Sequence, residues 1–221
     1  EQITVFPNES EMDDYASLVS DGLVGALVAG PPGIGPKRNF INLHYPEGTP
    51  VLSVDDDISQ LFIARSEKKL DNLPNLHWFV RDCFEFCESM HASLWGVYPV
   101  DNPYFMFRQP VVSVKLAFLI AAFYGFIATR QPWALVTLNN KEDYERSIKH
   151  YINEGKTVRF NHVSMRTRCY EETGGLQDGS RKQSEMESAQ YLVRKYPNYC
   201  SLYTKRKYAE VKLRDKTLKT R

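Results

Sequence analysis

The fold class is decided by one stretch, Thr49-Pro-Val-Leu-Ser-Val-Asp-Asp-Asp57, in which three consecutive carboxylates follow a short apolar run. A β-branched run bounded by proline is typical of a buried strand. Acidic residues at the carboxyl end of such a strand lie on the rim of an α/β sheet, where ligands bind. Side chains at positions i and i+2 of an extended chain point the same way, so Asp55 and Asp57 are placed to bind one divalent cation. A solvent-exposed acidic turn would also explain the three residues.

The segments around this stretch alternate between strand-like and helix-like patterns. We expect strands at residues 2–6, 23–29, 49–54 and 157–165, and helices at 9–19, 38–44, 75–91, 141–154 and 184–196. This alternation predicts an α/β fold with a mostly parallel (mixed), twisted sheet flanked by helices. A chain of 221 residues, 43% of them hydrophobic, is long enough for one sizeable domain, which we place at residues 1–204.

The C-terminal segment, residues 205–221, differs from the rest of the chain in charge. It holds eight Lys or Arg and two acidic residues, whereas the whole chain has a net charge of +1. We expect this segment to be a solvated basic tail or a terminal helix. Contact with an acidic acceptor, a membrane surface or nucleic acid is the alternative that its charge suggests.

Three features of the sequence bear on location and on zinc. The N-terminus has no basic region followed by an apolar one, so we expect no secretory signal. The longest apolar run, residues 116–128, is too short to span a bilayer. Cys83 and Cys87 have helical spacing without a second ligand pair, which does not predict a zinc site. We therefore expect a soluble cytoplasmic protein with free thiols and no membrane span.

The loop from Gly30 to Lys37 superficially resembles a phosphate-binding P-loop. We reject this interpretation because Gly35 and Lys37 are not adjacent, no Ser or Thr follows the lysine, and two prolines remove backbone donors. The loop instead brings Lys37 and Arg38 to the start of a helix. Cations there oppose the helix dipole, so an anionic ligand would account for their position, with a surface basic pair as the alternative.

Together these motifs carry a resemblance to a known family. The run Gly33-Ile-Gly-Pro-Lys-Arg-Asn39, the helix after it and Val51-Leu-Ser-Val-Asp-Asp-Asp-Ile58 resemble the donor site of GT-A fold glycosyltransferases, with its DxD motif. The chain is most similar to the small glycosyltransferases of large DNA viruses, such as those that glycosylate the chlorella-virus capsid, and to phage and TET-associated enzymes. The resemblance covers residues 2–62 well and 95–200 loosely. It implies a GT-A-like domain that would act in the host cytoplasm if the protein is virus-encoded.

The resemblance also implies roles for individual residues in donor binding. Asp57, together with Asp55, would bind the Mn²⁺ or Mg²⁺ that bridges the two phosphates of the donor. Asp55 would also contact the ribose or uridine side, and Asp56 would lie near the donor sugar. The remaining residues that the resemblance assigns to the donor nucleotide are Lys37, Arg38 and Asn39. A metal and cations at this place would stabilise the charge that develops on a nucleoside diphosphate leaving group.

An inverting transferase also needs a carboxylate that deprotonates the acceptor hydroxyl. The segment 174–187 resembles the family's glycine-rich acceptor loop, and Glu185 falls nearest the usual base position, with Glu187 and Asp178 as alternatives. The sequence departs there from the commoner Glu-Asp pair. Arg181 would reach the diphosphate from the same loop. For Glu187 the alternative is a capping box with Ser184, since the spacing is Ser-x-x-Glu.

The segment 95–106 is rich in aromatic residues, and we expect a loop between two core elements. Stacked aromatic rings with Asp101 and Asn102 would suit a sugar acceptor; alternatively, the aromatic residues complete the core.

The sequence thus predicts a metal-dependent glycosyltransferase that moves a hexose or deoxyhexose from a UDP-linked or other nucleotide-sugar donor to a glycan or glycoprotein acceptor, with inversion. Three alternatives remain open. A sugar-1-phosphate nucleotidyltransferase would need an N-terminal glycine-rich activation loop. A nucleotide-sugar-binding module would keep the donor site without the base. A transferase acting on modified DNA bases has the basic C-terminal segment as its only hint.

Overall fold

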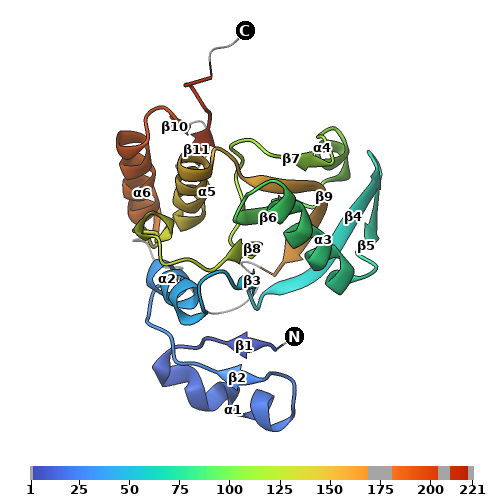
Figure 1. Cartoon of the computed structure of the whole chain (residues 1–221), viewed down its shortest axis with the longest axis vertical. Helices are drawn as coiled ribbons and strands as arrows, with labels where there is room; N and C mark the ends of the chain where they lie inside the picture. Colours follow the sequence, from blue (N-terminus) through green and yellow to red (C-terminus); the bar gives the residue numbers. More distant parts are fainter. Residues whose placement is uncertain (1, 169–180, 204–209, 219–221) are drawn as a thin grey trace.

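The computed structural model of the protein describes residues 2–168, 181–203 and 210–218. It shows a mixed α/β fold in which helices flank a curled sheet (Figure 1). The sheet has seven strands in the order β3-β8-β6-β9-β4-β5, and β7 pairs with β9 at its side. The strands are β3 (Pro50–Val54), β4 (Ile58–Ser66), β5 (Lys69–Asn72), β6 (Leu94–Tyr98), β7 (Val112–Ser113), β8 (Phe123–Ile127) and β9 (Val158–Thr167).

The expectation of a mostly parallel sheet is wrong. Within the described part of this sheet only β6 and β9 pair in parallel, and every other pair is antiparallel. The antiparallel pairing of β4 with β5 follows from their connection of two residues, which cannot hold a crossover helix. The strands expected at 49–54 and 157–165 are confirmed as β3 and β9.

The curl of the sheet follows from the acidic turn. Four strand spacings separate β3 from β4, which would be about 19 Å in a flat sheet. The three residues that join these strands, 55–57, let the chain span at most about 14 Å. The sheet therefore has to curl so that the end of β3 meets the start of β4, and the acidic turn lies where its two sides approach each other.

The N-terminal residues form a small parallel unit of their own (Figure 1). Its elements are β1 (Thr4–Val5), the 3-10 helix η1 (Glu9–Glu11), α1 (Met12–Ser20) and β2 (Ala26–Leu27), which confirms the expected strand, helix and strand. A bridge between Asn8 and Gly30 prolongs the strand pair at its carboxyl end. Phe6 packs against the core cluster that contains Ile41 and Val51, so the unit rests on the β3 side of the main sheet.

The sequence pattern predicts four of the remaining helices, two of them with a different start, and does not predict the two short ones. They are α2 (Ile34–His44), α3 (Leu76–Ser89), α4 (Pro103–Phe107), the 3-10 helix η2 (Pro132–Ala134), α5 (Glu142–Glu154) and α6 (Arg181–Lys195). The helix expected at 38–44 begins four residues earlier, because Gly33 takes φ 91° at the N-cap and Pro36 fits the first turn. The helix expected at 184–196 begins at residue 181. Gly155 caps α5 in the left-handed conformation, as expected.

The sheet core is built around Trp95, whose side chain is fully buried on β6. Phe79 and Phe84 of α3 meet its ring edge-on. On the neighbouring strand β8, Gly125 leaves room for this ring, because a Cβ there would lie 2.1 Å from the indole nitrogen. This packing fixes β8 beside β6 and so positions the turn that precedes β8, residues 121–122, next to the acidic turn.

The C-terminal segment corrects another expectation. Within residues 205–221, Glu210–Leu213 is strand β11, which pairs antiparallel with β10 (Cys200–Tyr203), so this part is neither a tail nor a helix. Val211 of β11 is buried in a cluster with residues of α5 and α6, and this packing holds β11 against the two helices. Among the described residues, no helix is both long enough and apolar enough to cross a membrane.

Candidate functional site

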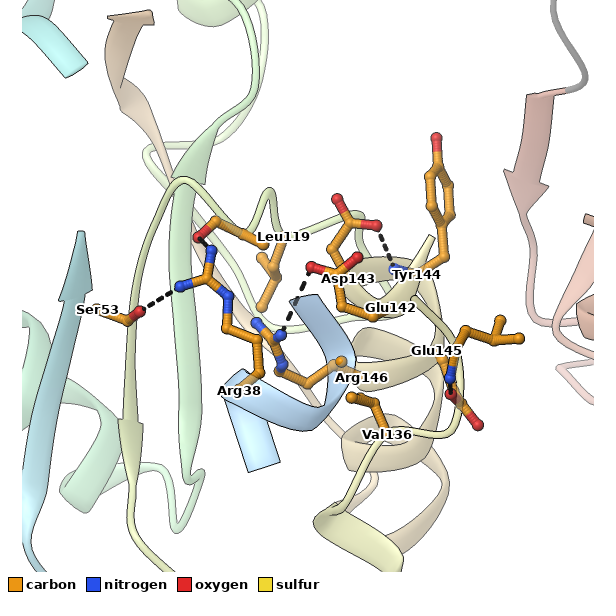
Figure 2. A network of polar contacts seen from close by, with 12 residues as sticks. Arg38, Ser53, Leu119, Val136, Glu142, Asp143, Tyr144, Glu145 and Arg146 are labelled. Carbon is orange, nitrogen blue, oxygen red and sulfur yellow. Dashed lines mark hydrogen bonds and ion pairs between the residues drawn. The ribbon is translucent and has the colours of Figure 1, made fainter. Parts of the chain in front are cut away.

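The acidic turn is held in place by Arg38 of α2. The guanidinium of Arg38 donates from Nη2 to the Oδ1 atom of Asp55 and to the carbonyl oxygen of Ala121 at 3.1 Å. Its Nη1 atom donates to Ser53 Oγ at 2.9 Å (Figure 2). The amide of Asp55 in turn donates to the carbonyl of Ala122 at 2.8 Å. Arg38 therefore joins α2, the end of β3 and the turn before β8.

The charge of Arg38 is fixed by its surroundings. Its side chain is only 12% exposed, and that burial opposes the charged form. The neighbouring Tyr124, Asp55 and Glu142 outweigh it and raise the pKa of Arg38 above its usual value. Since three protein acceptors occupy its terminal nitrogens, Arg38 orients Asp55 and supplies positive charge. The predicted direct contact with a donor nucleotide is not needed to explain its position.

The acidic residues 55–57 do not continue the extended chain of β3. Residues 56 and 57 lie in a turn, so the extended-chain argument for convergence of Asp55 and Asp57 does not apply. Asp55 is 36% exposed and open to solvent beside its contact with Arg38. Asp56 lies near α1, where burial, followed by the charge of Asp56, raises the pKa of Tyr15. The carbonyl of Asp57 accepts from the amide of Arg168 at 2.9 Å.

The described residues contain no group of three or more His, Cys, Asp or Glu side chains that would hold a metal ion by themselves. The predicted Mn²⁺ or Mg²⁺ site does not require such a group, because these ions are commonly held by one or two carboxylates together with substrate phosphates. The hard oxygen atoms of Asp55 and Asp57 fit that chemistry.

Lys37 lies where the two parallel N-terminal strands end. Its Nζ atom donates to Asn8 Oδ1 at 2.8 Å, and its side chain passes Gly30, the partner of Asn8 in the bridge. Ligands of α/β folds bind outside the carboxyl ends of parallel strands. The position of Lys37 therefore agrees with a contact to an anionic ligand.

Asn39 has a structural role that the sequence reasoning missed. Its amide donates to the carbonyl of Val136 and accepts from the amide of Val136, both at 2.8 Å. Three residues later, Asn42 forms the same pair of bonds with Thr129, at 2.7 and 3.0 Å. Both asparagines attach α2 to the segment before α5. The assignment of Asn39 to the donor stays a prediction, and its bonds to the backbone explain its position without a ligand.

The glycines of the run 33–39 also serve this attachment. A Cβ at Gly35 would lie 2.2 Å from the carbonyl oxygen of Leu138, so only glycine lets α2 approach so closely. The Gly35 amide donates to Asn139 Oδ1 at 3.2 Å. This contact brings the first turn of α5 beside Arg38, which is the most important consequence of the glycine-rich run for the site.

The first turn of α5 supplies an acidic pair that the sequence reasoning did not assign. Glu142 is buried, and one of its carboxylate oxygens lies 3.9 Å from Arg146 Nη2. Asp143 is partly buried, and its Oδ1 atom accepts from the amide of Tyr144 at 2.8 Å (Figure 2). Burial, with the neighbouring Glu142 carboxylate, raises the pKa of Asp143 to about 7. A carboxylate with such a pKa is partly deprotonated near neutrality, as a general base must be. The adjacent Glu-Asp pair at a helix start was the signal that could have identified it.

Glu185 is brought to the same place from α6. Its Oε2 atom lies 3.9 Å from Lys141 Nζ, and the preceding Ser184 accepts a hydrogen bond from Asn140 Nδ2. Acidic residues from the first turn of α5 and from the second turn of α6 thus lie near Lys141.

The alternatives to Glu185 have different outcomes. Glu187 is exposed and accepts from Gln183 at 2.6 Å. Since α6 begins at residue 181, Ser184 is not its N-cap and the predicted capping box is wrong. Asp178 lies outside the described residues, and so does the side chain of Arg181.

The aromatic segment 95–106 is not the expected loop. It contains most of β6 and of α4, and Trp95 and Met106 are fully buried, as the alternative interpretation had it. Asp101 forms an ion pair with Arg166 at 2.5 Å. Asn102 caps α4 by accepting from the amide of Tyr104 at 3.2 Å. Both polar residues therefore have structural partners.

Comparison with models of protein families, with curated proteins and with solved structures gave no match for the chain. The acidic turn, the first turn of α5 and Glu185 of α6 together make up the candidate site.

Proposed function

We propose that the protein is a glycosyltransferase of the GT-A type that transfers a hexose or deoxyhexose from a nucleotide sugar to a glycan or glycoprotein. The observation that carries the proposal is the Arg38–Asp55 pair on the sheet rim, beside the acidic first turn of α5. Donor-binding charges and a carboxylate with a raised pKa are the two groups that inverting transfer requires.

The donor half of the site supports a nucleoside diphosphate. Lys37 lies at the carboxyl end of the parallel N-terminal strands, and Asp55 follows the carboxyl end of β3. A Mn²⁺ or Mg²⁺ ion, when bound by Asp55 and Asp57, would offset the charge of the two phosphates. The positive charge of Arg38 lowers the cost of placing a diphosphate next to the acidic turn.

The acceptor half of the site supports inversion with Asp143 as the general base. Its carboxylate would take the proton from the acceptor hydroxyl while the hydroxyl oxygen attacks the anomeric carbon. The bond from that carbon to the diphosphate oxygen breaks at the same time, and the nucleoside diphosphate leaves with the electron pair. Asp143 is favoured as the base because burial and the neighbouring Glu142 raise its pKa to about 7.

Donor hydrolysis tests this proposal without knowledge of the acceptor. The purified protein is incubated with UDP- and GDP-linked hexoses and deoxyhexoses in the presence of Mn²⁺ or Mg²⁺, and the released nucleoside diphosphate is measured. We expect release from at least one donor and a 10²–10⁴-fold loss in Asp143→Asn, the range for a lost general base.

Two further variants identify the base. Glu185→Gln should keep most of the activity if Asp143 is the base, and Glu187→Gln is the matched control from the exposed face of α6. Loss of activity in Glu185→Gln with retention in Asp143→Asn would exchange the two roles. No release from any donor with either metal would contradict the proposed function.

A further inference from the structure

Arg159 of β9 is a partly buried arginine without a carboxylate partner. Among the described side chains, the arginines that are not exposed are Arg38, Arg146 and Arg159. Arg38 pairs with Asp55, and Arg146 lies 3.9 Å from a carboxylate oxygen of Glu142. No carboxylate of the described residues forms an ion pair with Arg159, and burial lowers the pKa of its guanidinium. Since a charge removed from water is costly without a partner, we expect an anion beside Arg159.

The guanidinium of Arg159 is held in one orientation. Its Nε atom donates to Asn161 Oδ1 at 2.7 Å, and its Nη1 atom donates to the carbonyl oxygen of Phe118 at 3.4 Å. Asn161 is fully buried, and its Nδ2 atom donates to the Pro110 carbonyl and to Ser113 Oγ, both at 2.7 Å. A guanidinium that is fixed in this way binds an anion with little further loss of side-chain entropy.

Arg159 and the adjacent Tyr98 of β6 each keep one open donor. The guanidinium lies over the Tyr98 ring, 5.1 Å from its centroid. Within the part of the chain that the structure describes, Arg159 Nη2 and the Tyr98 hydroxyl have no hydrogen-bond partner. Neither is among the buried polar atoms that lack a partner, so solvent reaches both atoms. A guanidinium nitrogen and a phenolic hydroxyl are donors to the oxygens of carboxylate, sulfate and phosphate groups.

Arg159 lies on the same face of the sheet as the candidate site. Cross-strand pairs place four residues in one row across β3, β8, β6 and β9, namely Ser53, Tyr124, Gly96 and Arg159. Side chains in such a row point to one face of a sheet. Three strand spacings, about 14 Å, separate the two ends of the row. Leu119 fills the space above Gly96, where a Cβ would lie 3.2 Å from the Leu119 Cβ. An anion at Arg159 is therefore distinct from the diphosphate proposed beside the acidic turn.

Phe118 connects Arg159 to the acceptor half of the site. The carbonyl of Phe118 accepts from Arg159, and its ring stacks on that of Tyr144 at a centroid distance of 4.2 Å. Tyr144 follows Asp143, the proposed base, and its amide donates to that carboxylate at 2.8 Å. Arg159 thus lies one aromatic stack away from the turn that would receive the proton of the acceptor.

We propose that Arg159 and Tyr98 bind an anionic group of the acceptor, so that the acceptor is an acidic sugar with a carboxylate, sulfate or phosphate group. The term acceptor rests on the proposed function, whereas the anion site does not. The bound oxyanion would accept from Arg159 Nη2 and from the Tyr98 hydroxyl, and these two bonds would orient the sugar toward Asp143.

Binding of methyl glucuronide tests the site without donor, metal or turnover. Its affinity for the wild type is measured by NMR titration at low ionic strength, with methyl glucoside, which lacks the carboxylate, as the neutral control. Sulfated and phosphorylated glucose are titrated in the same way. We expect at least one of the three anionic sugars to bind about tenfold or more tightly than the glucoside, since hydrogen bonds to a charged group are worth that factor. Equal affinity for all four sugars would overturn the proposal.

Two variants locate the anion. Arg159→Gln and Tyr98→Phe should each weaken binding of the preferred anionic sugar by about tenfold or more. Tyr98→Phe keeps the ring below the guanidinium and removes only the hydroxyl, so it serves as the test if Arg159→Gln does not fold. Arg108→Gln is the matched control, because Arg108 also lies over a tyrosine ring, 3.9 Å from the centroid, but pairs with Glu67. Unchanged affinity in either folded variant, or an equal loss in Arg108→Gln, would overturn the proposal.

Titration with UDP and Mn²⁺ separates the acceptor from the donor as the source of the anion. Arg159→Gln should bind UDP like the wild type. A loss of UDP affinity with unchanged affinity for the anionic sugar would assign Arg159 to the donor phosphates and overturn the proposal. If no nucleotide sugar is hydrolysed while the anionic sugar binds with the stated preference, the proposed function fails and the anion site stands.

Discussion

The guanidinium of Arg38 binds the carboxylate of Asp55, and this one contact joins α2 to the turn that follows β3. The same guanidinium reaches Ser53 on β3 and the carbonyl of Ala121 before β8. The first turn of α5 also lies near Arg38, because the carboxylate of Glu142 in that turn helps to raise the pKa of Arg38. Arg38 therefore positions the acidic turn and the first turn of α5, the proposed donor and acceptor halves of the site, relative to each other.

Loss of Arg38 should reduce stability as well as any activity. Arg38→Met removes donors from Ser53, Asp55 and the Ala121 carbonyl, and we expect the free energy of unfolding to fall by about 2–4 kcal/mol. The control Arg81→Met removes an exposed arginine with surface ion pairs and should cost less than about 1 kcal/mol. Urea unfolding measures both. Equal losses in the two variants would show that Arg38 has no central structural role.

The glycine of the first turn of α2 should be irreplaceable. In Gly35→Ala the new Cβ would meet the Leu138 carbonyl at 2.2 Å, so we expect a loss of about 1–3 kcal/mol despite the better helix propensity of alanine. Gly30→Ala is the matched control, because the nearest atoms to its Cβ would lie at 3.5 Å, an ordinary contact. Thermal unfolding distinguishes them. A Gly35→Ala protein as stable as the wild type would contradict the close approach of α2 to the segment before α5.

Asn39 should affect stability and not nucleotide affinity. Asn39→Ala leaves the amide and carbonyl of Val136 without partners, and we expect a loss of about 2–4 kcal/mol. Asn42→Ala should cost a similar amount, because Asn42 makes the same pair of bonds with Thr129. Isothermal titration with UDP, under conditions in which both variants are folded, should give unchanged affinity. A selective loss of affinity in Asn39→Ala would confirm Asn39 as a donor contact.

The raised pKa of Asp143 predicts an effect of pH on stability. Burial and Glu142 raise this pKa to about 7, well above that of an unfolded aspartate, so the folded state holds a proton that the unfolded state has lost. The stabilising contribution is complete below about pH 4 and is lost as the pH rises through about 7. Asp143→Asn should therefore gain stability relative to the wild type between these values, on the order of 1–3 kcal/mol.

Urea unfolding at several values between pH 4 and pH 8 checks this prediction. Asp13→Asn, which changes an exposed carboxylate of α1, serves as the control and should follow the wild type. If the difference between Asp143→Asn and the wild type does not change with pH, the pKa of Asp143 is not raised.

The elements of the fold could be predicted from the sequence, and their pairing could not. Periodicity is local, so the strands around β3 and β9 and the helices α1, α3 and α5 were found within a few residues. Pairing depends on contacts between distant segments, and the parallel expectation failed because β8 returns antiparallel to both β3 and β6.

The candidate site was predicted in part for the same reason. Asp55 and Arg38 carry a local motif, and the structure brings them together. The helix predicted at residues 141–154 is strongly polar, yet its Glu142, Glu145 and Arg146 are buried, because charged partners compensate one another there. The partner of Asn39 lies 97 positions away, beyond the reach of any spacing argument.

The most direct test of the central claim is calorimetric titration of the protein with UDP and with GDP, with and without Mn²⁺, in the wild type and in Asp57→Ala. The account predicts metal-dependent binding of at least one nucleotide by the wild type and at least a tenfold loss of affinity in Asp57→Ala. Asp71→Ala, which removes a carboxylate that β5 pairs with Arg65 and Lys69, should bind like the wild type. Metal-dependent affinity that is undiminished in Asp57→Ala, or no metal-dependent binding of either nucleotide by the wild type, would contradict the account.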